Sequence, residues 1–155
     1  MYSFDASSMI HAWDNYPIKN PHFDSLWEWF ALQVSDENFV FSQIAYKEVN
    51  NKVPECGEWL KSNNVKIEPL SADIIYQGQT IKELLEIEEE NYTNGVGEND
   101  ILIISTAKIS NTILITEESR QNNLPPKKSN YKIPAVCALV EVNVQCKNFT
   151  DLLKE

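Results

Sequence analysis

Four acidic residues stand far apart in this 155-residue chain, each where a strand is expected to end or a helix to begin: Asp5, Glu48, Asp100 and Glu118. Carboxylates that meet without a counter-charge repel one another, so a shared site requires protonation or a cation. Hard oxygen ligands in this number suit Mg²⁺ or Mn²⁺, and with only two histidines present a zinc site is disfavoured. The chemistry indicated is metal-assisted hydrolysis of a phosphodiester.

Short apolar segments that precede the acids have the composition of buried strands. The strongest strand signal is Thr112–Thr116, because every residue in it is β-branched or aliphatic. A first strand ends where the charged Asp5 arrives. The sequence therefore predicts strands over 1–5, 39–41, 65–67 and 112–116.

Helices are expected between these strands. Apolar residues spaced by three and four predict a core-facing helix over 23–30. Ser42 is placed to cap a helix that carries Glu48 on an early turn, and Ser71 to cap a longer helix that continues through Ile87 to an acidic run at 88–90. Asn99 is expected to cap the next helix, with Asp100 in its first turn. A short amphipathic helix is expected near 149–153.

This alternation predicts an α/β domain with a mainly parallel central sheet flanked by helices. The chain has neither an internal repeat nor a glycine-rich linker, so a single domain over 1–155 is expected. The carboxyl ends of the strands form the ligand crevice in such a sheet. Asp5 and Glu118 should lie there, with Glu48 and Asp100 in helices that begin near the same edge.

Composition restricts the partners. A formal charge of −10 and a pI near 4.7 disfavour binding to nucleic acid or to a membrane surface by charge alone. The longest aliphatic run, 101–104, is far shorter than the roughly 20 residues that cross a bilayer. No secretory signal is visible at the start of the chain, so a cytoplasmic location without membrane contact is expected.

The acidity is uneven along the chain. Residues 1–107 carry 18 acidic and 6 basic side chains, whereas residues 108–155 carry 5 acidic and 7 basic ones. No acid occurs between Glu118 and Glu141, where the basic residues are Arg120, Lys127, Lys128 and Lys132. This strip is a candidate for binding RNA phosphates, and the alternative is an ordinary exposed loop.

Each acid also has a purely structural interpretation. Asp5 is a suitable helix cap, an acid such as Asp100 stabilises a first helical turn without any function, and Glu48 alone would be a solvated helix residue. The run Glu86, Glu88, Glu89, Glu90 is interpreted as a solvated face without chemistry. The ordered set of acids, rather than any single one, favours a shared site.

At these residues the sequence resembles the PIN domain. The resemblance is carried by the opening YSFDASS at 2–8, by Glu48, by NDILIISTA at 99–107 and by ITEE at 115–118. The segment KIPAVC at 132–137 further resembles a bacterial PIN-like branch, the domain of unknown function DUF4411.

The resemblance implies a divalent-metal-dependent endoribonuclease, often the toxin of a VapBC-type pair, with an RNA substrate, an antitoxin partner and a homodimeric state. It places Asp5, Glu48 and Asp100 at the three main acidic positions and Glu118 at the fourth, where many members carry Asp. Thr116 matches a supporting hydroxyl. Glu117 competes for the fourth position, and Glu98 is an outside candidate.

Other functions are compatible with the same residues. A PIN-fold nuclease acting on DNA and a catalytically idle PIN-like binding module both remain open. A haloacid-type phosphatase would require a second acid at position 7, where the chain has Ser7, and no paired acids typical of a phosphoryl-accepting receiver follow the first strand.

Overall fold

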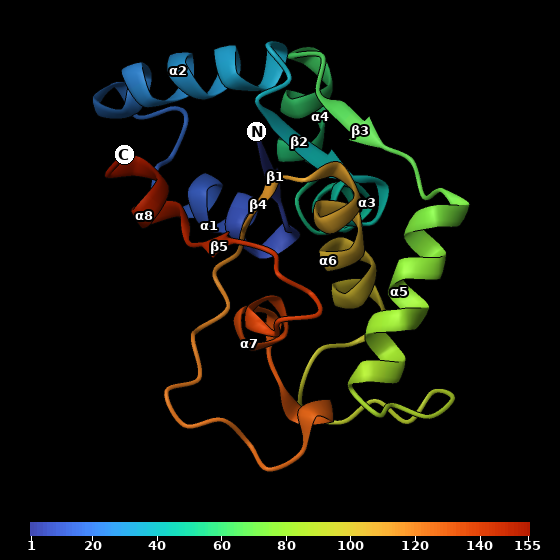
Figure 1. Ribbon diagram of the computed structural model, residues 1–155. Helices are drawn as coiled ribbons and strands as arrows, with labels where there is room; N and C mark the ends of the chain where they lie inside the picture. The colour runs from blue at the N-terminus through green and yellow to red at the C-terminus, as the bar shows by residue number, and fades with distance from the viewer.

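The computed structural model describes residues 1–155 and is built around one five-stranded sheet (Figure 1). All neighbouring strands pair in parallel, in the order β3-β2-β1-β4-β5, which confirms the predicted mainly parallel α/β architecture. Phe4 is in register with both Phe41 and Ile115, so the central strands end at the same level. The strands are β1 Tyr2–Phe4, β2 Phe39–Ser42, β3 Lys66–Glu68, β4 Ile113–Ile115 and β5 Cys146–Lys147.

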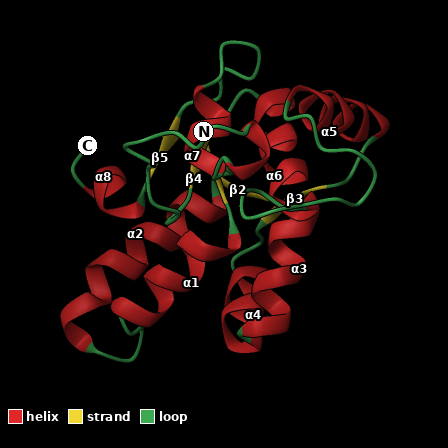
Figure 2. Cartoon of the chain, turned by 90° about the horizontal axis from the view of Figure 1, so that it is seen from below, coloured by secondary structure: helices red, strands yellow, loops and turns green.

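Helices cover both faces of the sheet, as Figure 2 shows. The connections that precede β2 and β3 place four helices on one face: α1 Ala6–Asn15, α2 Asp24–Ser35, α3 Gln43–Lys52 and α4 Pro54–Ser62. The other face is covered by α5 Ala72–Leu84, α6 Glu98–Ser110 and α7 Ile133–Ala138. The chain ends in α8 Phe149–Leu153. No helix is sufficiently long and apolar to cross a membrane.

Two of the predicted caps are confirmed. The Ser42 hydroxyl accepts a hydrogen bond from the Ala45 N–H at 3.0 Å, and the Ser71 hydroxyl accepts one from the Ile74 N–H at 3.2 Å. Each bond satisfies a backbone donor that the first helical turn leaves free.

Two predicted helix boundaries are wrong. The helix that begins after Ser71 ends at Leu84 rather than Ile87, because Glu86 adopts a left-handed conformation with a φ of 58° and the Ile87 N–H donates back to the Lys82 carbonyl. The next helix is capped by Gly97 rather than Asn99, since the Gly97 N–H donates to the Asp100 carboxylate and closes the first turn.

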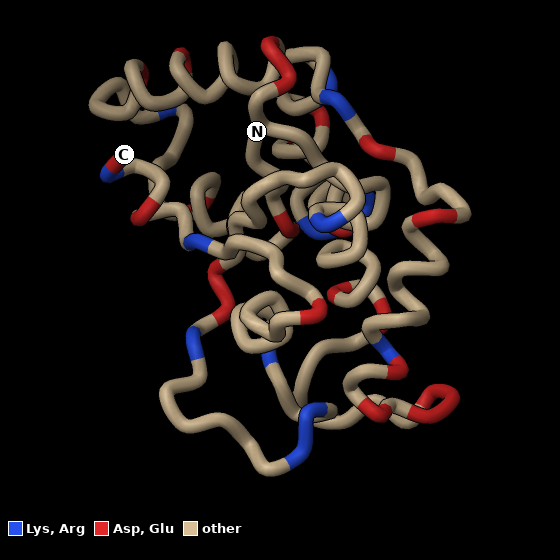
Figure 3. The backbone as a smooth tube through the Cα atoms, in the orientation of Figure 1, with Lys and Arg blue, Asp and Glu red and all other residues tan.

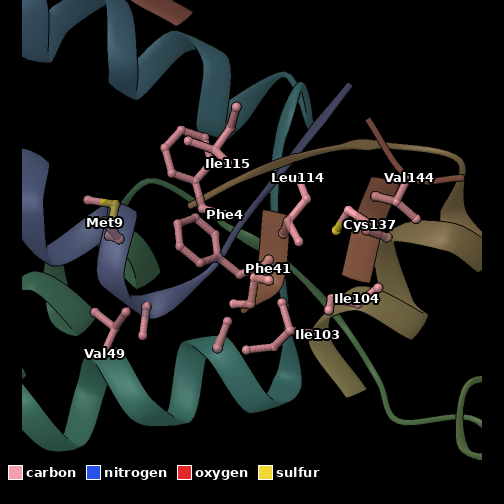
Figure 4. Packing of buried hydrophobic residues seen from close by; sticks show 14 of the residues in the cluster. Phe4, Met9, Phe41, Val49, Ile103, Ile104, Leu114, Ile115, Cys137 and Val144 are labelled. Carbon is pink, nitrogen blue, oxygen red and sulfur yellow. The ribbon is translucent and has the colours of Figure 1, made fainter. Parts of the chain in front are cut away.

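The core fills both sides of the sheet with apolar side chains. Successive residues of β4, Leu114 and Ile115, point to opposite faces, as expected for a strand covered on both sides (Figure 4). On the face of α1 and α2, the Phe4 ring lies 4.8 Å from Phe39 and 5.4 Å from Phe30, measured between centroids. This packing fixes the carboxyl end of β1.

Two loops distant in sequence pack against each other below the sheet in Figure 1. The Val96 N–H donates to the Tyr131 carbonyl at 2.8 Å, and the Thr93 hydroxyl donates to the Ser129 carbonyl at 2.9 Å. A Cβ on Gly95 would lie 2.4 Å from the Ser129 carbonyl oxygen, so glycine is required for this approach. The contact holds the segment before α6 beside the segment before α7.

Candidate active site

Asp5 lies at the carboxyl end of β1 and is 3% exposed. Its Oδ1 accepts a hydrogen bond from the Ser8 N–H at 2.8 Å, so the carboxylate caps α1. Burial raises the pKa of Asp5 above its ordinary value of 3.8, although hydrogen bonds from Thr116, Ser8 and Ser7 oppose the shift. A carboxylate held in this way is poised to accept a cation.

Asp100 lies in the first turn of α6 and is partly buried. Its Oδ2 accepts a hydrogen bond from the Gly97 N–H at 3.0 Å, and this bond fixes the carboxylate at the start of the helix. The predicted first-turn position is therefore observed, three residues after a glycine cap rather than one residue after Asn99.

Glu118 follows β4 and points toward the start of α7. Its Oε2 accepts a hydrogen bond from the Ile133 N–H at 2.7 Å. The pKa of Glu118 is raised above its ordinary value of 4.5, foremost by burial and further by the charges of Asp100 and Asp5, while Ile133 and Lys132 oppose the shift. Asp100 and Asp5 thus lie near enough to Glu118 for their charges to act on its carboxylate.

The three carboxylates follow a common pattern. Each gives one oxygen to a backbone N–H at the N-terminal end of a helix: α1 for Asp5, α6 for Asp100 and α7 for Glu118. The positive ends of these helix dipoles favour the ionised form. The second oxygen of Asp100 and of Glu118 has no hydrogen-bond partner, and that of Asp5 shares the Ser7 hydroxyl, so each can receive a further ligand.

Glu48 occupies a different environment. It lies in the second turn of α3, a helix that packs against both α1 and α6. Its carboxylate is 3.8 Å from the Lys52 ammonium, and its side chain is 34% exposed. No backbone amide anchors it. Glu48 thus lies on a neighbouring helix, and its side chain is less restrained than those of the three acids that bond a backbone amide.

Glu117 and Glu118 are adjacent but face different helices. Glu117 Oε1 accepts a hydrogen bond from the Phe149 N–H at 2.8 Å, at the start of α8, and Oε2 lies 3.9 Å from His11 Nδ1. Glu118 instead faces α7 and is coupled to the other acids. The exposed Glu98, at the first residue of α6, is not among the groups that shift the pKa of either buried acid.

Two hydroxyls link the ends of β1 and β4. Thr116, 1% exposed, accepts a hydrogen bond from the Glu118 N–H at 3.2 Å and is also hydrogen-bonded to Asp5. The Ser7 hydroxyl lies 2.9 Å from both carboxylate oxygens of Asp5 and accepts a hydrogen bond from the Glu117 N–H at 3.1 Å. The sequence did not predict this supporting role for the Ser7 hydroxyl. Its position two residues after a buried acid is the signal that could have suggested one.

A divalent ion fits this donor set by chemistry, because the available atoms are carboxylate oxygens and the acids raise one another's affinity for positive charge. In their present side-chain positions, no three Asp, Glu, His or Cys residues are arranged as a ready metal cage. Rotation of the unanchored oxygens toward a common point would be needed to form one.

The predicted basic strip is divided by the fold. Figure 3 shows the long loop between β4 and α7 with basic segments and no acidic ones after Glu118. Arg120 lines a polar hollow of about 450 Å³ together with Glu118, and Lys132 is close enough to lower the pKa of Glu118. Lys127 and Lys128 instead line a separate hollow of about 360 Å³, whose other walls include Glu86 and Glu88.

Comparisons with known proteins identify the family of the chain. The family model of DUF4411, a domain of unknown function, matches residues 2–155. No curated protein matches the sequence.

Solved structures share the fold at low sequence identity. VapBC2 from Rickettsia felis, solved bound to a DNA fragment from its promoter, has 19% identity and a TM-score of 0.56 over 96% of this chain and 98% of its own. FitAcB from Neisseria gonorrhoeae has 15% identity and a TM-score of 0.54 over 96% and 97%. PAE2754 from Pyrobaculum aerophilum has 13% identity and a TM-score of 0.50 over 92% and 88%.

These neighbours contain PIN-domain chains, and the parallel sheet with its flanking helices matches theirs across nearly the whole length. The family match covers residues 2–155, a range that includes the segment 132–137 on which the resemblance to this family is based. The chain therefore belongs to the DUF4411 family and has the fold of a PIN domain.

Proposed function

We propose that this chain is a divalent-metal-dependent endoribonuclease, one PIN domain over residues 1–155 that acts as the toxin of a toxin–antitoxin pair. The observation that carries the proposal is the set of Asp5, Asp100 and Glu118, each anchored by one oxygen at a helix N-terminus with the other oxygen available. Burial first, and then the charges of Asp100 and Asp5, raise the pKa of Glu118, which supports a site that a cation would neutralise.

The roles follow from the anchoring. Asp5, Asp100 and Glu118 would hold Mg²⁺ or Mn²⁺, and Glu48 would reach the ion or its water from α3. When bound, the ion would neutralise charge on the phosphate and lower the pKa of a coordinated water. Thr116 and Ser7 hold the Asp5 carboxylate in one orientation, so the ligands are positioned before substrate arrives.

Glu118 is proposed as the fourth acid in preference to Glu117. The supporting observation is that Glu117 is committed to the start of α8 and to His11, while Glu118 is coupled to Asp5 and Asp100. The Glu118 side chain bonds the Ile133 N–H at the start of α7 with one oxygen and leaves the other without a partner.

The partners are proposed from the fold neighbours and from charge. VapBC2 and FitAcB give the likeness in fold that supports a toxin role with an antitoxin partner. A homodimer, which the resemblance to the PIN domain implies, is part of the proposal. RNA is the proposed substrate, with Arg120 and Lys132 nearest the acids and Lys127 and Lys128 further along the loop. A cytoplasmic location suits a substrate of this kind.

The test is cleavage of matched nucleic acids by the purified full chain. Single-stranded RNA and DNA of the same sequence are incubated with Mg²⁺, with Mn²⁺ or with EDTA, and the products are resolved by gel electrophoresis. We expect RNA cleavage with either ion, none in EDTA, and products with a 5′-phosphate. The Asp100→Asn variant serves as the inactive control and Glu89→Gln as the matched active one.

Each other outcome identifies an alternative. Equal or preferential cleavage of DNA would assign the site to DNA. Absence of cleavage together with absence of any ion-dependent rise in Tm would indicate an idle binding module, and either result contradicts the proposal.

A further inference from the structure

A third hollow adjoins the polar hollow that Glu118 lines. It has a volume of about 460 Å³ and lies between the loop after β4 and the elements α7 and β5. Leu124, Pro134, Ala135 and Val144 give it apolar walls, and Arg120 and Asn122 lie at its polar rim. We call this space the apolar hollow. Its size is in the range of pockets that take small organic ligands.

The apolar hollow continues toward the acids. Arg120, Pro134 and Cys146 line both the apolar hollow and the polar hollow that contains Thr116 and Glu118. A ligand seated in the apolar hollow therefore lies one side chain away from the hollow that Glu118 lines. The two hollows thus form one continuous space, with apolar walls in the apolar hollow and polar walls beside Glu118.

Arg120 stands at the junction and carries an unpaired charge. Its guanidinium forms no ion pair and makes one long hydrogen bond, from Nη2 to the Cys146 carbonyl at 3.5 Å. Most of its donors are free, in a chain whose net charge is −10. A planar guanidinium with free donors matches a phosphate in geometry and charge.

We infer that these hollows form a subsite for one nucleotide of the RNA substrate, with its phosphate on Arg120 and its base in the apolar hollow. The inference rests on the proposed function and adds a determinant of where the RNA is cut. A base has apolar faces and a polar edge, which suits aliphatic walls beside the Asn122 amide. The Arg120 guanidinium also offers a plane on which a base can stack.

Two substitutions distinguish the contribution of the phosphate contact to binding from that of the base contact. Arg120→Gln removes the charge, and Ala135→Leu, on the partly exposed side of α7, fills the apolar hollow. Lys19→Gln is the matched control for charge, since Lys19 is exposed between α1 and α2 and lines neither hollow. Ala31→Leu, on α2, is the control for adding the same side chain elsewhere.

The experiment measures equilibrium binding to the full chain by calorimetry without divalent ions, with the four 5′-nucleoside monophosphates and inorganic phosphate as probes. We expect at least one nucleotide to bind roughly tenfold more tightly than phosphate, since the base buries apolar surface. Arg120→Gln should weaken both probes about tenfold. Ala135→Leu should reduce nucleotide affinity to that of phosphate and leave phosphate unchanged, while both controls bind like wild type.

Cleavage provides a second readout. For RNAs that differ in one base at the cut site, Ala135→Leu should reduce the spread of kcat/KM, with the ion-dependent rise in Tm unchanged. Equal affinity for nucleotides and phosphate, or nucleotide affinity that neither substitution changes, would overturn the subsite and assign the hollow to another occupant such as a protein segment. Because binding is measured without metal or turnover, a chain that cleaves RNA but fails this test loses the subsite alone. A chain that fails to cleave RNA loses the proposed function.

Discussion

Two acidic regions of the molecule contrast with each other. Asp5, Asp100 and Glu118 converge from distant parts of the sequence, and each gives an oxygen to a backbone amide. The glutamates Glu86, Glu88, Glu89 and Glu90 lie within five residues, interrupted only by the buried Ile87, and all four are exposed. None of their carboxylates accepts a hydrogen bond or forms an ion pair within 4 Å. The density of charge in the sequence therefore does not locate the site. Burial and anchoring do.

The largest expected difference between the two regions is in catalysis. Asp100→Asn keeps the shape of the side chain but removes a ligand charge, so kcat for RNA cleavage should fall at least about a hundredfold. Glu89→Gln, in the exposed run, should stay within about twofold. The comparison is made at saturating Mg²⁺ with both variants at equal folded fraction. An active Asp100→Asn enzyme would break the contrast.

Metal binding should separate the regions by stability. A divalent ion at a hundred times its Kd stabilises the fold by about 2.7 kcal/mol, which corresponds to a Tm increase of about 5–10 °C in a domain of this size. Asp5→Asn should abolish the increase, because it removes a preformed ligand. Replacing Glu88, Glu89 and Glu90 together by Gln should retain it. Differential scanning calorimetry with Mg²⁺ or EDTA makes the measurement, and equal Tm values in both buffers for the wild type would count against a metal site.

The exposed run belongs to a loop whose backbone, not its carboxylates, matters to the fold. Gly95→Ala would place a methyl 2.4–2.6 Å from backbone atoms of residues 129–131, so the free energy of unfolding should fall by about 1–3 kcal/mol. A Cβ on Gly97 meets nothing within 4 Å, which makes Gly97→Ala the matched control with an effect of a few tenths of a kcal/mol. Urea unfolding measures the free energy of unfolding of both variants. An equal decrease in the two variants would contradict the proposed importance of the loop contact.

The pH dependence of metal-free stability should also distinguish the regions. Burial raises the folded-state pKa of Asp5 and Glu118, so between the ordinary and raised values the folded state binds more protons than the unfolded one. Stability should therefore decrease as pH rises through that window. The Asp5→Asn, Glu118→Gln double variant should lose this component. Replacing two exposed acids, Glu89 and Glu90, by Gln corrects for the change in net charge, and if that control alters the pH slope equally, the assignment fails.

The smallest expected effect concerns the divided basic strip. Replacing Lys127 and Lys128 by Gln should raise KM about twofold to threefold, lower the salt dependence of KM and leave kcat unchanged, since these lysines hold ground state and transition state alike. Their position beside Glu86 and Glu88 limits the effect. Cleavage kinetics at two salt concentrations test it. An unchanged KM and salt slope would show that RNA does not follow this part of the loop.

Most of the sheet could be predicted from local sequence. The composition of β1, β2, β3 and β4 and the caps at Ser42 and Ser71 are local signals, because strand composition and capping depend on a few adjacent residues. The elements not anticipated were α4, α7 and β5. α4 follows α3 after a single residue and has no side-chain cap, α7 has six residues and β5 has two, so each is too short or too poorly marked for a periodic pattern.

The candidate site was less accessible to sequence reasoning. The order of acids and the strand ends suggested which residues could meet, and Asp5 and Asp100 occupy the expected local positions. The side chains of Glu117 and Glu118 face different helices, which the sequence could not predict because the two residues are adjacent and identical. Their partners, Phe149 and Ile133, lie 32 and 15 residues away, and only the tertiary structure brings these amides to the end of β4.

The strand order has a consequence for biosynthesis. β1, at the start of the chain, lies between β2 and β4, and β4 begins at Ile113. The sheet centre is thus closed by a contact between residues more than a hundred positions apart, and Glu118 gains its anchor only when Ile133 has emerged. A nascent chain on the ribosome cannot assemble the three anchored carboxylates until residue 133 has been made. The topology itself would delay formation of the proposed nuclease site beside the RNA of the ribosome that translates the chain.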